Sequence, residues 1–238
     1  MTRISLLHPS RGRPEKSLAT DKYWIDRAGN VEIELIVSID ANDQPREYLS
    51  VYSNGDPIIS MSERFGDTKE FYMEAPWKAK FFIISGDNSC VVEATNKAAE
   101  RSTGDILVYL SDDFKCPENW GELLVREFEE DRPLLVKVDD CLQKFDVPVL
   151  TIPIMNRALY ERLGYFWHPE YKSMAVDEDL YWTAKKLNAM KLAPHLAFPH
   201  EHPANGKAPD DETYRRSAAN WDQGQAVFRR RKAAGFPI

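Results

Sequence analysis

Residues 103–113 read TGDILVYLSDD, and this stretch decides the fold class. Thr103 and Gly104 break a helix predicted over residues 91–101, and the apolar run 106–110 that follows has the length of a buried strand. Ser111-Asp112-Asp113 comes directly after this strand. A helix, a break and a buried strand in this order indicate an α/β protein with parallel strands.

The start of the chain shows the same alternation. Residues 4–8 predict a strand, residues 14–28 a helix, and residues 31–39 a second strand that ends at Asp40. The crossover helix implies parallel neighbouring strands, and ligands bind at the carboxyl ends of such strands. We therefore expect Asp40 and the two aspartates of the SDD motif on the same rim of one sheet.

The rest of the chain predicts further elements, with one stretch left open. Residues 41–75 carry Asn, Asp, Gly and Pro at short intervals, so we predict loops there with no more than one helix. The other predicted elements are strands at 81–85, 134–138 and 149–154, and helices at 120–130, 157–163, 177–187 and 211–234.

Composition places the chain among ordinary globular proteins. Its 238 residues suit a single domain, and a formal net charge of −7 argues against a general nucleic-acid-binding surface. Three cysteines without close spacing suggest neither a disulfide framework nor a zinc site. No apolar run is long enough to span a membrane and the start does not read as a signal peptide, so we expect a cytoplasmic protein without a membrane partner.

The aspartates that end the strands suggest a cation site. Closely spaced carboxylates hold hard divalent ions such as Mg²⁺ or Mn²⁺, whose other positions accept water and phosphate oxygens. Aspartates after strands also commonly cap turns and helices. Two acidic clusters on one rim, Asp40 to Asp43 and Asp112-Asp113, favour the cation.

Together these motifs resemble the family-2-type glycosyltransferases of GT-A fold. The likeness rests on Asp40, on Asn88 ahead of a helix containing Ala94-Thr95-Asn96, and on the TGDIL and SDD motifs. It covers nearly the whole chain except residues 44–80. The resemblance implies a mostly parallel, Rossmann-like sheet flanked by helices, with a small antiparallel portion on the acceptor side. It also implies a single domain over residues 1–238. Residues 1–113 would form its nucleotide-binding half, and residues 114–238 its acceptor-binding half with a C-terminal helix.

The resemblance also assigns roles on the donor side. Asp40 would contact the nucleoside, Asp113 would bind Mn²⁺ or Mg²⁺, and Ser111 departs from the aspartate common at the first motif position. The donor would be a UDP-type nucleotide-sugar. The other donor-binding candidates are Pro9, Arg11 and Arg13 of the first loop, Asn88, Asp112, and Lys207 in a loop that would close over the phosphates.

On the acceptor side, the segment Val176-Asp177-Glu178-Asp179 is similar to the place where the family carries its general base. Asp177 matches that position best, with Glu178 and Asp179 as fallback candidates, and direct displacement would invert the anomeric carbon. An acidic helix start also offsets the helix dipole without any catalysis. His200 and His202 lie two residues apart after an apolar run. In similar enzymes a late histidine completes the coordination shell of the metal. We favour His202 for this role, with His200 as the other candidate.

The acceptor stays open at this stage. The likeness extends to short enzymes of phages and bacteria, so a glycan or a hydroxylated DNA base is conceivable, and only the basic cluster Arg229 to Lys232 supports DNA. Two alternatives remain: a nucleotidyltransferase acting on sugar phosphates, and a non-catalytic sugar-binding module of the same fold.

Overall fold

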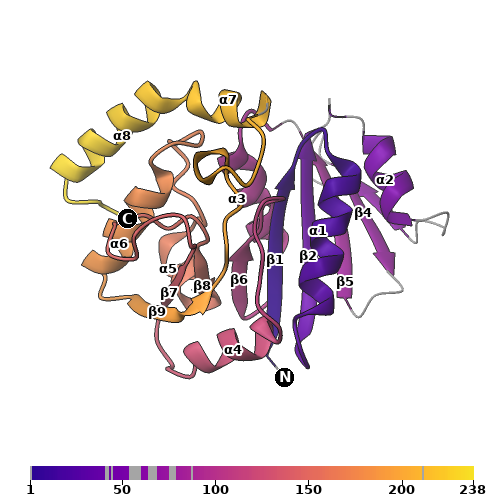
Figure 1. Cartoon of the computed structure of the whole chain (residues 1–238), viewed down its shortest axis with the longest axis horizontal. Helices are drawn as coiled ribbons and strands as arrows, with labels where there is room; N and C mark the ends of the chain where they lie inside the picture. The colour runs from indigo at the N-terminus through magenta and orange to yellow at the C-terminus, as the bar shows by residue number, and fades with distance from the viewer. Residues whose placement is uncertain are drawn as a thin grey trace.

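The computed structural model describes residues 2–40, 43, 45–53, 60–63, 69–74, 79–86, 88–210 and 212–238. Its centre is a nine-stranded sheet in the order β3-β4-β5-β2-β1-β6-β8-β7-β9 (Figure 1). The four middle strands, β5, β2, β1 and β6, are parallel, and antiparallel strands flank them on both sides. The strands are β1 (Arg3–Ser10), β2 (Glu32–Asp40), β3 (Ser60–Glu63), β4 (Lys69–Glu74), β5 (Ala79–Gly86), β6 (Ile106–Tyr109), β7 (Leu135–Asp139), β8 (Ile154–Asn156) and β9 (Met190–Ala197).

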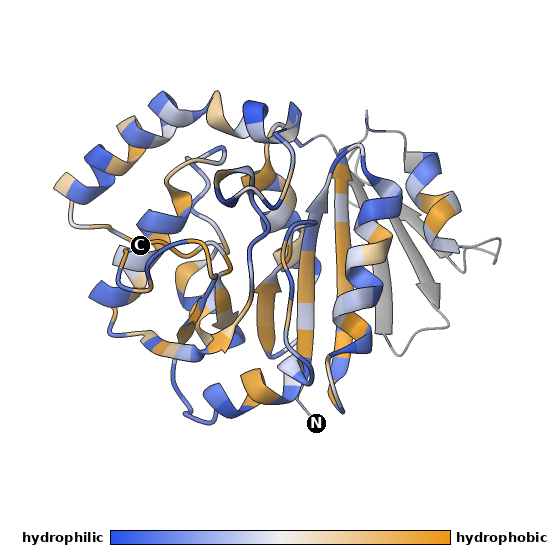
Figure 2. Cartoon of the chain, in the orientation of Figure 1, coloured by the Kyte–Doolittle hydropathy of each residue, from blue (hydrophilic) through white to orange (hydrophobic). Residues whose placement is uncertain are grey.

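Helices cover both faces of this sheet because successive strand residues point to opposite sides. Ile4 and Leu6 of β1 pack in a core with α1, α2 and α4, whereas Leu7 packs in a second core with α3, α5, α6 and α8. Hydrophobic residues concentrate on the central strands in Figure 2, and blue stretches run along the helices. The helices are α1 (Pro14–Asp26), α2 (Pro45–Ser53), α3 (Val91–Arg101), α4 (Trp120–Glu127), α5 (Arg157–Leu163), α6 (Val176–Lys186), η1 (Pro203–Asn205), α7 (Glu212–Ala218) and α8 (Trp221–Ala233).

The stretch 103–113 folds as predicted. α3 ends at Arg101, β6 follows at Ile106, and β6 lies parallel to β1. Gly104 fits this turn because a Cβ atom there would lie 2.5 Å from the hydroxyl oxygen of Ser5. The opening β1-α1-β2 unit is confirmed as parallel, and the α/β GT-A-type architecture is the one expected from sequence.

Three predictions of local structure are corrected. The strand predicted at 149–154 begins only at Ile154, because Pro148 and Pro153 cannot donate to a ladder. The helix predicted at 211–234 is two helices, since a turn at 219–220 redirects the chain so that Gly224 of α8 packs on the backbone of Met174. The open stretch 41–75 contains α2, β3 and β4; its other residues, apart from Asp43, lie outside the described residues, as do Asp87 and Asp211.

Two further findings concern the whole described chain. No described helix is long and apolar enough to cross a membrane. All three cysteines are free, with Cys116 buried and Cys141 exposed.

Candidate active site

The carboxyl ends of β1, β2 and β6 form one rim, as the sequence predicted. β1 lies between the other two strands, so Asp40 at the end of β2 and the Asp112-Asp113 pair after β6 flank the loop that follows Ser10. In Figure 1 the N-terminus lies at the bottom and α7 at the top, over the end of the sheet where this rim is found.

Asp113 has the most elaborate surroundings on the rim. Its buried carboxylate accepts hydrogen bonds on Oδ2 from the Tyr214 hydroxyl (2.6 Å) and faces Nε2 of His200 at 3.1 Å. Burial acts to raise the pKa of Asp113, but the hydrogen bonds and charge of His200 and the bond from Tyr214 outweigh it, so the pKa lies well below its ordinary value. Asp113 is therefore held as a carboxylate.

His200 and His202 differ in their contacts with this carboxylate. His200 faces Asp113 through Nε2, and its buried Nδ1 has no hydrogen-bond partner among the described residues. His202 instead accepts a hydrogen bond on Nδ1 from the backbone of Ala204, and caps η1. The neutral ring of His202 therefore carries its proton on Nε2, the nitrogen that faces away from this bond.

The backbone ties the His200 segment to the Asp113 segment. Phe114 and His200 form an isolated antiparallel bridge, the amide of Lys115 donates to Pro199 (2.9 Å), and the amide of Glu201 donates to Asp113 (2.7 Å). The rings of Phe114 and His200 also meet edge to face with centroids 4.7 Å apart. Backbone hydrogen bonds thus hold together two segments that are far apart in sequence.

The donor set fits a divalent cation with few protein ligands. Oδ1 of Asp113, like Nδ1 of His200, is buried without a hydrogen-bond partner in the described chain, and a carboxylate with an imidazole suits Mn²⁺. Within the described ranges no group of three or more His, Cys, Asp and Glu is arranged to hold a metal. A cation here would therefore keep most of its positions for water and phosphate.

The first loop places both predicted arginines at the rim. Arg11 forms an ion pair with Asp40, and Arg13 lies 3.5 Å from Asp112. Gly12 between them has φ +64, a conformation that favours glycine. Pro9 pairs in register with Ser38 of β2, and it lies beyond the last β1 residue paired with β6, so its missing N–H leaves that ladder intact.

Asn88 also lies where the sequence predicted. Its buried amide donates to the carbonyl of Ile39, the residue before Asp40, at 3.1 Å. Its Oδ1 has no partner among the described residues. An acceptor atom thus remains unpartnered near the end of β2.

Lys207 does not join the rim in this structure. Its side chain is exposed in the turn after η1, and its backbone amide bonds to His202 and Asn205. Its charge acts on Cys141, in the loop after β7.

Asp177 lies in the first turn of α6, and its charge acts on Tyr109 at the end of β6. Burial raises the pKa of the Tyr109 phenol, and the charges of Asp113, Asp112 and Asp177 raise it further, so all three carboxylates act on the same phenol. Burial likewise raises the pKa of Asp177, which accepts one backbone hydrogen bond from Glu178 at 2.9 Å. Ala175, the N-cap of α6, holds φ at 65, a strained value for a non-glycine residue.

The neighbouring acids of α6 have other surroundings. Asp179 is buried against Arg231, with Nε of the arginine 2.7 Å from Oδ2, and accepts a bond from the Tyr171 hydroxyl. This ion pair fixes α8 to α6 and makes Asp179 structural. Arg230 pairs with Glu170, so two of the four basic residues at 229–232 serve contacts within the chain, which weakens the DNA hypothesis.

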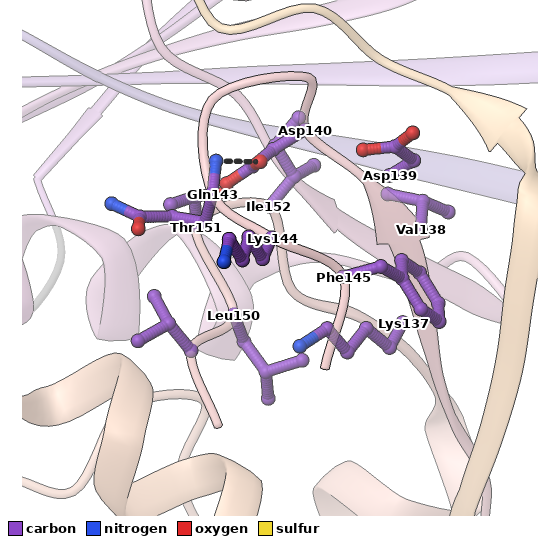
Figure 3. Close-up of a pocket in the computed structure, with 11 residues that line it drawn as sticks. Lys137, Val138, Asp139, Asp140, Gln143, Lys144, Phe145, Leu150, Thr151 and Ile152 are labelled. Carbon is purple, nitrogen blue, oxygen red and sulfur yellow. Dashed lines mark hydrogen bonds between the residues drawn. The ribbon is translucent and has the colours of Figure 1, made fainter. Parts of the chain in front are cut away.

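A small hollow lies at the loop after β7, lined by Lys137, Gln143, Leu150 and residues of that loop (Figure 3). None of the predicted site residues lines it. Asp140 connects it to the site, because Asp140 borders the hollow and its charge contributes to the raised pKa of Asp177.

Several rim residues were not predicted from sequence. Tyr214 contacts Asp113 across 101 residues, and His8 lies fully buried between Asp21 and Asp112. Tyr52 donates to Asp21 from α2, within the stretch left open by the sequence. His8 alone carried a local signal, since a histidine in an apolar strand needs a buried partner.

Known structures share this fold. A mannosyltransferase, PcManGT from Pyrobaculum calidifontis in complex with GDP-Man and Mn²⁺, matches with a TM-score of 0.64 at 14% identity over 96% of this chain and 64% of that chain. S. aureus TarS 1-349 matches with a TM-score of 0.59 at 12% identity over 84% and 60%. A complex of TarS 1-349 with UDP-GlcNAc gives 0.52 at 13% identity over 91% and 64%. The chain thus spans less than two thirds of these proteins.

The fold and the acidic rim define a GT-A-type protein. The sequence profile of glycosyl transferase family 2 matches residues 69–188, half of the chain. The chain belongs to this family, as the sequence motifs indicated. No curated protein matches its sequence.

Proposed function

We propose that the chain transfers a sugar from a nucleotide-sugar donor to an acceptor hydroxyl with inversion. The arrangement that carries this proposal is the buried Asp113 carboxylate facing His200 at 3.1 Å, with the charges of Asp113 and Asp177 both acting on Tyr109. One end of the site is thus kept anionic beside the predicted diphosphate loop, and the other carries a carboxylate with a raised pKa. This division matches what displacement at an anomeric carbon requires.

On the donor side, Asp113 and His200 would hold Mn²⁺ or Mg²⁺, and the ion would supply Lewis-acid stabilisation to the departing diphosphate. Arg11 and Arg13 lie where they can pair with phosphate oxygens, and Asp40 and Asn88 lie at the nucleoside end. We propose a UDP-type donor. Lys207 would reach the phosphates only if its turn moved toward the rim.

On the acceptor side, Asp177 would take the proton from the attacking hydroxyl. Its raised pKa makes it a better proton acceptor than an exposed aspartate, and its described hydrogen bonds come from backbone amides and not from an arginine. Trp167 packs edge to face on Tyr109 with centroids 5.6 Å apart, which gives this side an aromatic wall suited to a sugar acceptor. We propose a glycan as the acceptor.

Donor binding tests the proposal first. Thermal unfolding with UDP-GlcNAc or GDP-Man should shift upward when Mn²⁺ is present, because a ligand that binds only the folded state stabilises it. Release of UDP during turnover would support glycosyl transfer, whereas pyrophosphate would identify a nucleotidyltransferase. Donor binding without any release would identify a non-catalytic module, and no shift with any nucleotide-sugar would contradict the proposal.

The two histidines offer a matched pair for the cation. His200→Ala should abolish the dependence of donor binding on Mn²⁺, while His202→Ala in the same loop should keep it, since only His200 contacts Asp113 directly. Titration calorimetry with Mn²⁺ and UDP measures both. The reverse result would assign the ligand to His202.

A further inference from the structure

The most deeply buried charged group near the rim is His8 of β1. Its ring has no solvent exposure, and its two nitrogens face two different carboxylates, Nδ1 at 2.8 Å from Asp21 and Nε2 at 3.0 Å from Asp112. Asp21, on α1, is also fully buried. Within the described residues this cluster is separate from the Asp113 and His200 contact.

With Asp21 and Asp112 both ionised, the geometry places a proton on each nitrogen of His8. A carboxylate oxygen only accepts hydrogen bonds, so a neutral ring would turn one lone pair toward one of the two aspartates. Burial acts to lower the pKa of His8, but the charges and hydrogen bonds of Asp21 and Asp112 outweigh it and raise the pKa to about 10. His8 is thus a buried imidazolium.

The surrounding hydroxyl groups add hydrogen bonds to the cluster but carry no positive charge. Tyr52 donates to Oδ2 of Asp21, the oxygen that His8 does not contact, and Ser17 lies between Tyr52 (2.6 Å) and the ring of His8 (3.4 Å). Every oxygen of Asp21 therefore has a donor. Asp21 serves as the fixed counter-charge that keeps His8 in place.

From Asp21 the charges alternate in sign toward the rim. Asp21 and His8 are unexposed, Asp112 is 7% exposed, and Arg13, 3.5 Å from Asp112, is 19% exposed. The row is negative, positive, negative, positive, and only its last member has substantial contact with solvent. Without His8, the buried carboxylates of Asp21 and Asp112 would repel each other with no cation between them.

We propose that His8 is a positioning residue for the donor: as a buried cation it fixes the Asp112 carboxylate, and through Asp112 it orients Arg13 toward the donor's diphosphate. This inference rests on the proposed function, because Asp112 and Arg13 face the donor there. It adds a residue that takes part without touching the substrate. His8 should therefore affect binding of the donor and not binding of the acceptor.

The charge state of His8 can be measured without any activity. In wild-type protein labelled with ¹⁵N on histidine, the His8 ring should show two protonated nitrogens at pH 7.5, a state that exposed histidines do not keep at that pH. A neutral His8 ring at pH 7.5 would overturn the inference.

Kinetics then separate positioning from general stability. His8→Gln should raise the donor KM by ~10- to 100-fold, the range known for partners that orient a ligating group, while the acceptor KM changes little. Tyr52→Phe removes the hydroxyl that bonds to Asp21 and Ser17 and keeps the cation, so it should change the donor KM by less than ~3-fold by the same comparison.

Each outcome is decisive. Unchanged donor affinity in a folded His8→Gln variant would overturn the positioning role, as would equal effects on donor and acceptor KM. If that variant does not fold, the ring protonation of the wild type and the affinity of Arg13→Gln for UDP decide: a neutral ring or an unchanged affinity overturns the inference. Failure of the wild type to bind any nucleotide-sugar would instead overturn the proposed function, whatever the state of His8.

Discussion

Asp113 and Asp177 are the same kind of residue in opposite surroundings. Asp113, on the donor side, is bonded by Tyr214 and faces His200, and its pKa lies below the ordinary value. Asp177, on the proposed acceptor side, is half-buried, its described hydrogen bonds come from backbone amides, and its pKa lies above that value. Both lie near the ring of Tyr109.

This contrast shows how one fold can hold two carboxylates for different tasks. Hydrogen-bond donors around Asp113 favour the ionised form that a cation needs, while burial without a cationic partner makes Asp177 ready to take a proton. The neighbouring residues in sequence do not show this difference in pKa, because both are aspartates beside other acids near the end or the start of an element; only the family resemblance assigned them different roles.

The largest effect should come from Asp177→Asn. We expect the rate of transfer to fall by ~10²- to 10⁴-fold, because the base is lost, while the affinity for donor stays near the wild-type value. Product formation and calorimetry with UDP measure the two quantities. Glu178→Gln, the next residue of α6, is the control and should keep most of the activity; an active Asp177→Asn variant would remove Asp177 from the mechanism.

A smaller loss, confined to the donor side, should follow Asp113→Asn. Affinity for Mn²⁺ in the presence of UDP should drop by at least ~100-fold, since even outer partners of metal ligands contribute ~10- to 100-fold. The exposed Asp146, replaced by Asn, serves as the control. Mn²⁺ binding that survives in Asp113→Asn would show that the two carboxylates do not differ as described.

Tyr214→Phe should weaken the same affinity by ~10-fold, because the Asp113 carboxylate loses a hydrogen bond that orients it. Calorimetry with Mn²⁺ and UDP measures the change. Tyr160→Phe on α5 is the matched control, and equal affinity in both variants would mean that the Tyr214 contact has no part in cation binding.

The smallest effect is a change in Tm, and we expect it to have opposite signs in Asp113→Asn and Asp177→Asn. With EDTA present, Asp113→Asn should lower the Tm at pH 7.5, because a carboxylate with a lowered pKa contributes stability above its unfolded pKa that is lost on acidification. Asp177→Asn should raise the Tm at pH 7.5, because a raised pKa means that ionisation costs stability as the pH rises through it. Both differences should shrink toward pH 3.

Calorimetric scans from pH 3 to pH 8 would measure the two curves, with Asp146→Asn as a flat reference. Shifts of the same sign in Asp113→Asn and Asp177→Asn at pH 7.5 would contradict the opposite environments of the two carboxylates.

The parts of the fold that follow local patterns could be predicted. α3 and α5 lie over the residues expected, and β1, β2 and β6 lie within two residues of their predicted bounds, because apolar runs and a Thr-Gly break mark them. The division of the last helix could not be foreseen, since Gly224 packs on Met174, 50 positions earlier in the chain.

The site divides in the same way. Aspartates at strand ends can be read from sequence because parallel strands bring their carboxyl ends together. The partners that give each aspartate its character cannot, because His200, Tyr214 and His8 reach Asp113 and Asp112 across about 90 to 100 residues. The proposed preference for His200 over His202 as a cation ligand also could not be predicted, because it depends on the backbone amide of Ala204, which donates to Nδ1 of His202.

The backbone bridge joining Phe114 to His200 has a consequence for the rate of cation capture. Backbone bonds at Lys115 and Glu201 already hold the carboxylate and the imidazole together, so the entropy of ordering them is lost during folding and not upon binding. Association with Mn²⁺ should therefore be limited by dehydration of the ion and diffusion to the rim, with no slow rearrangement of the chain.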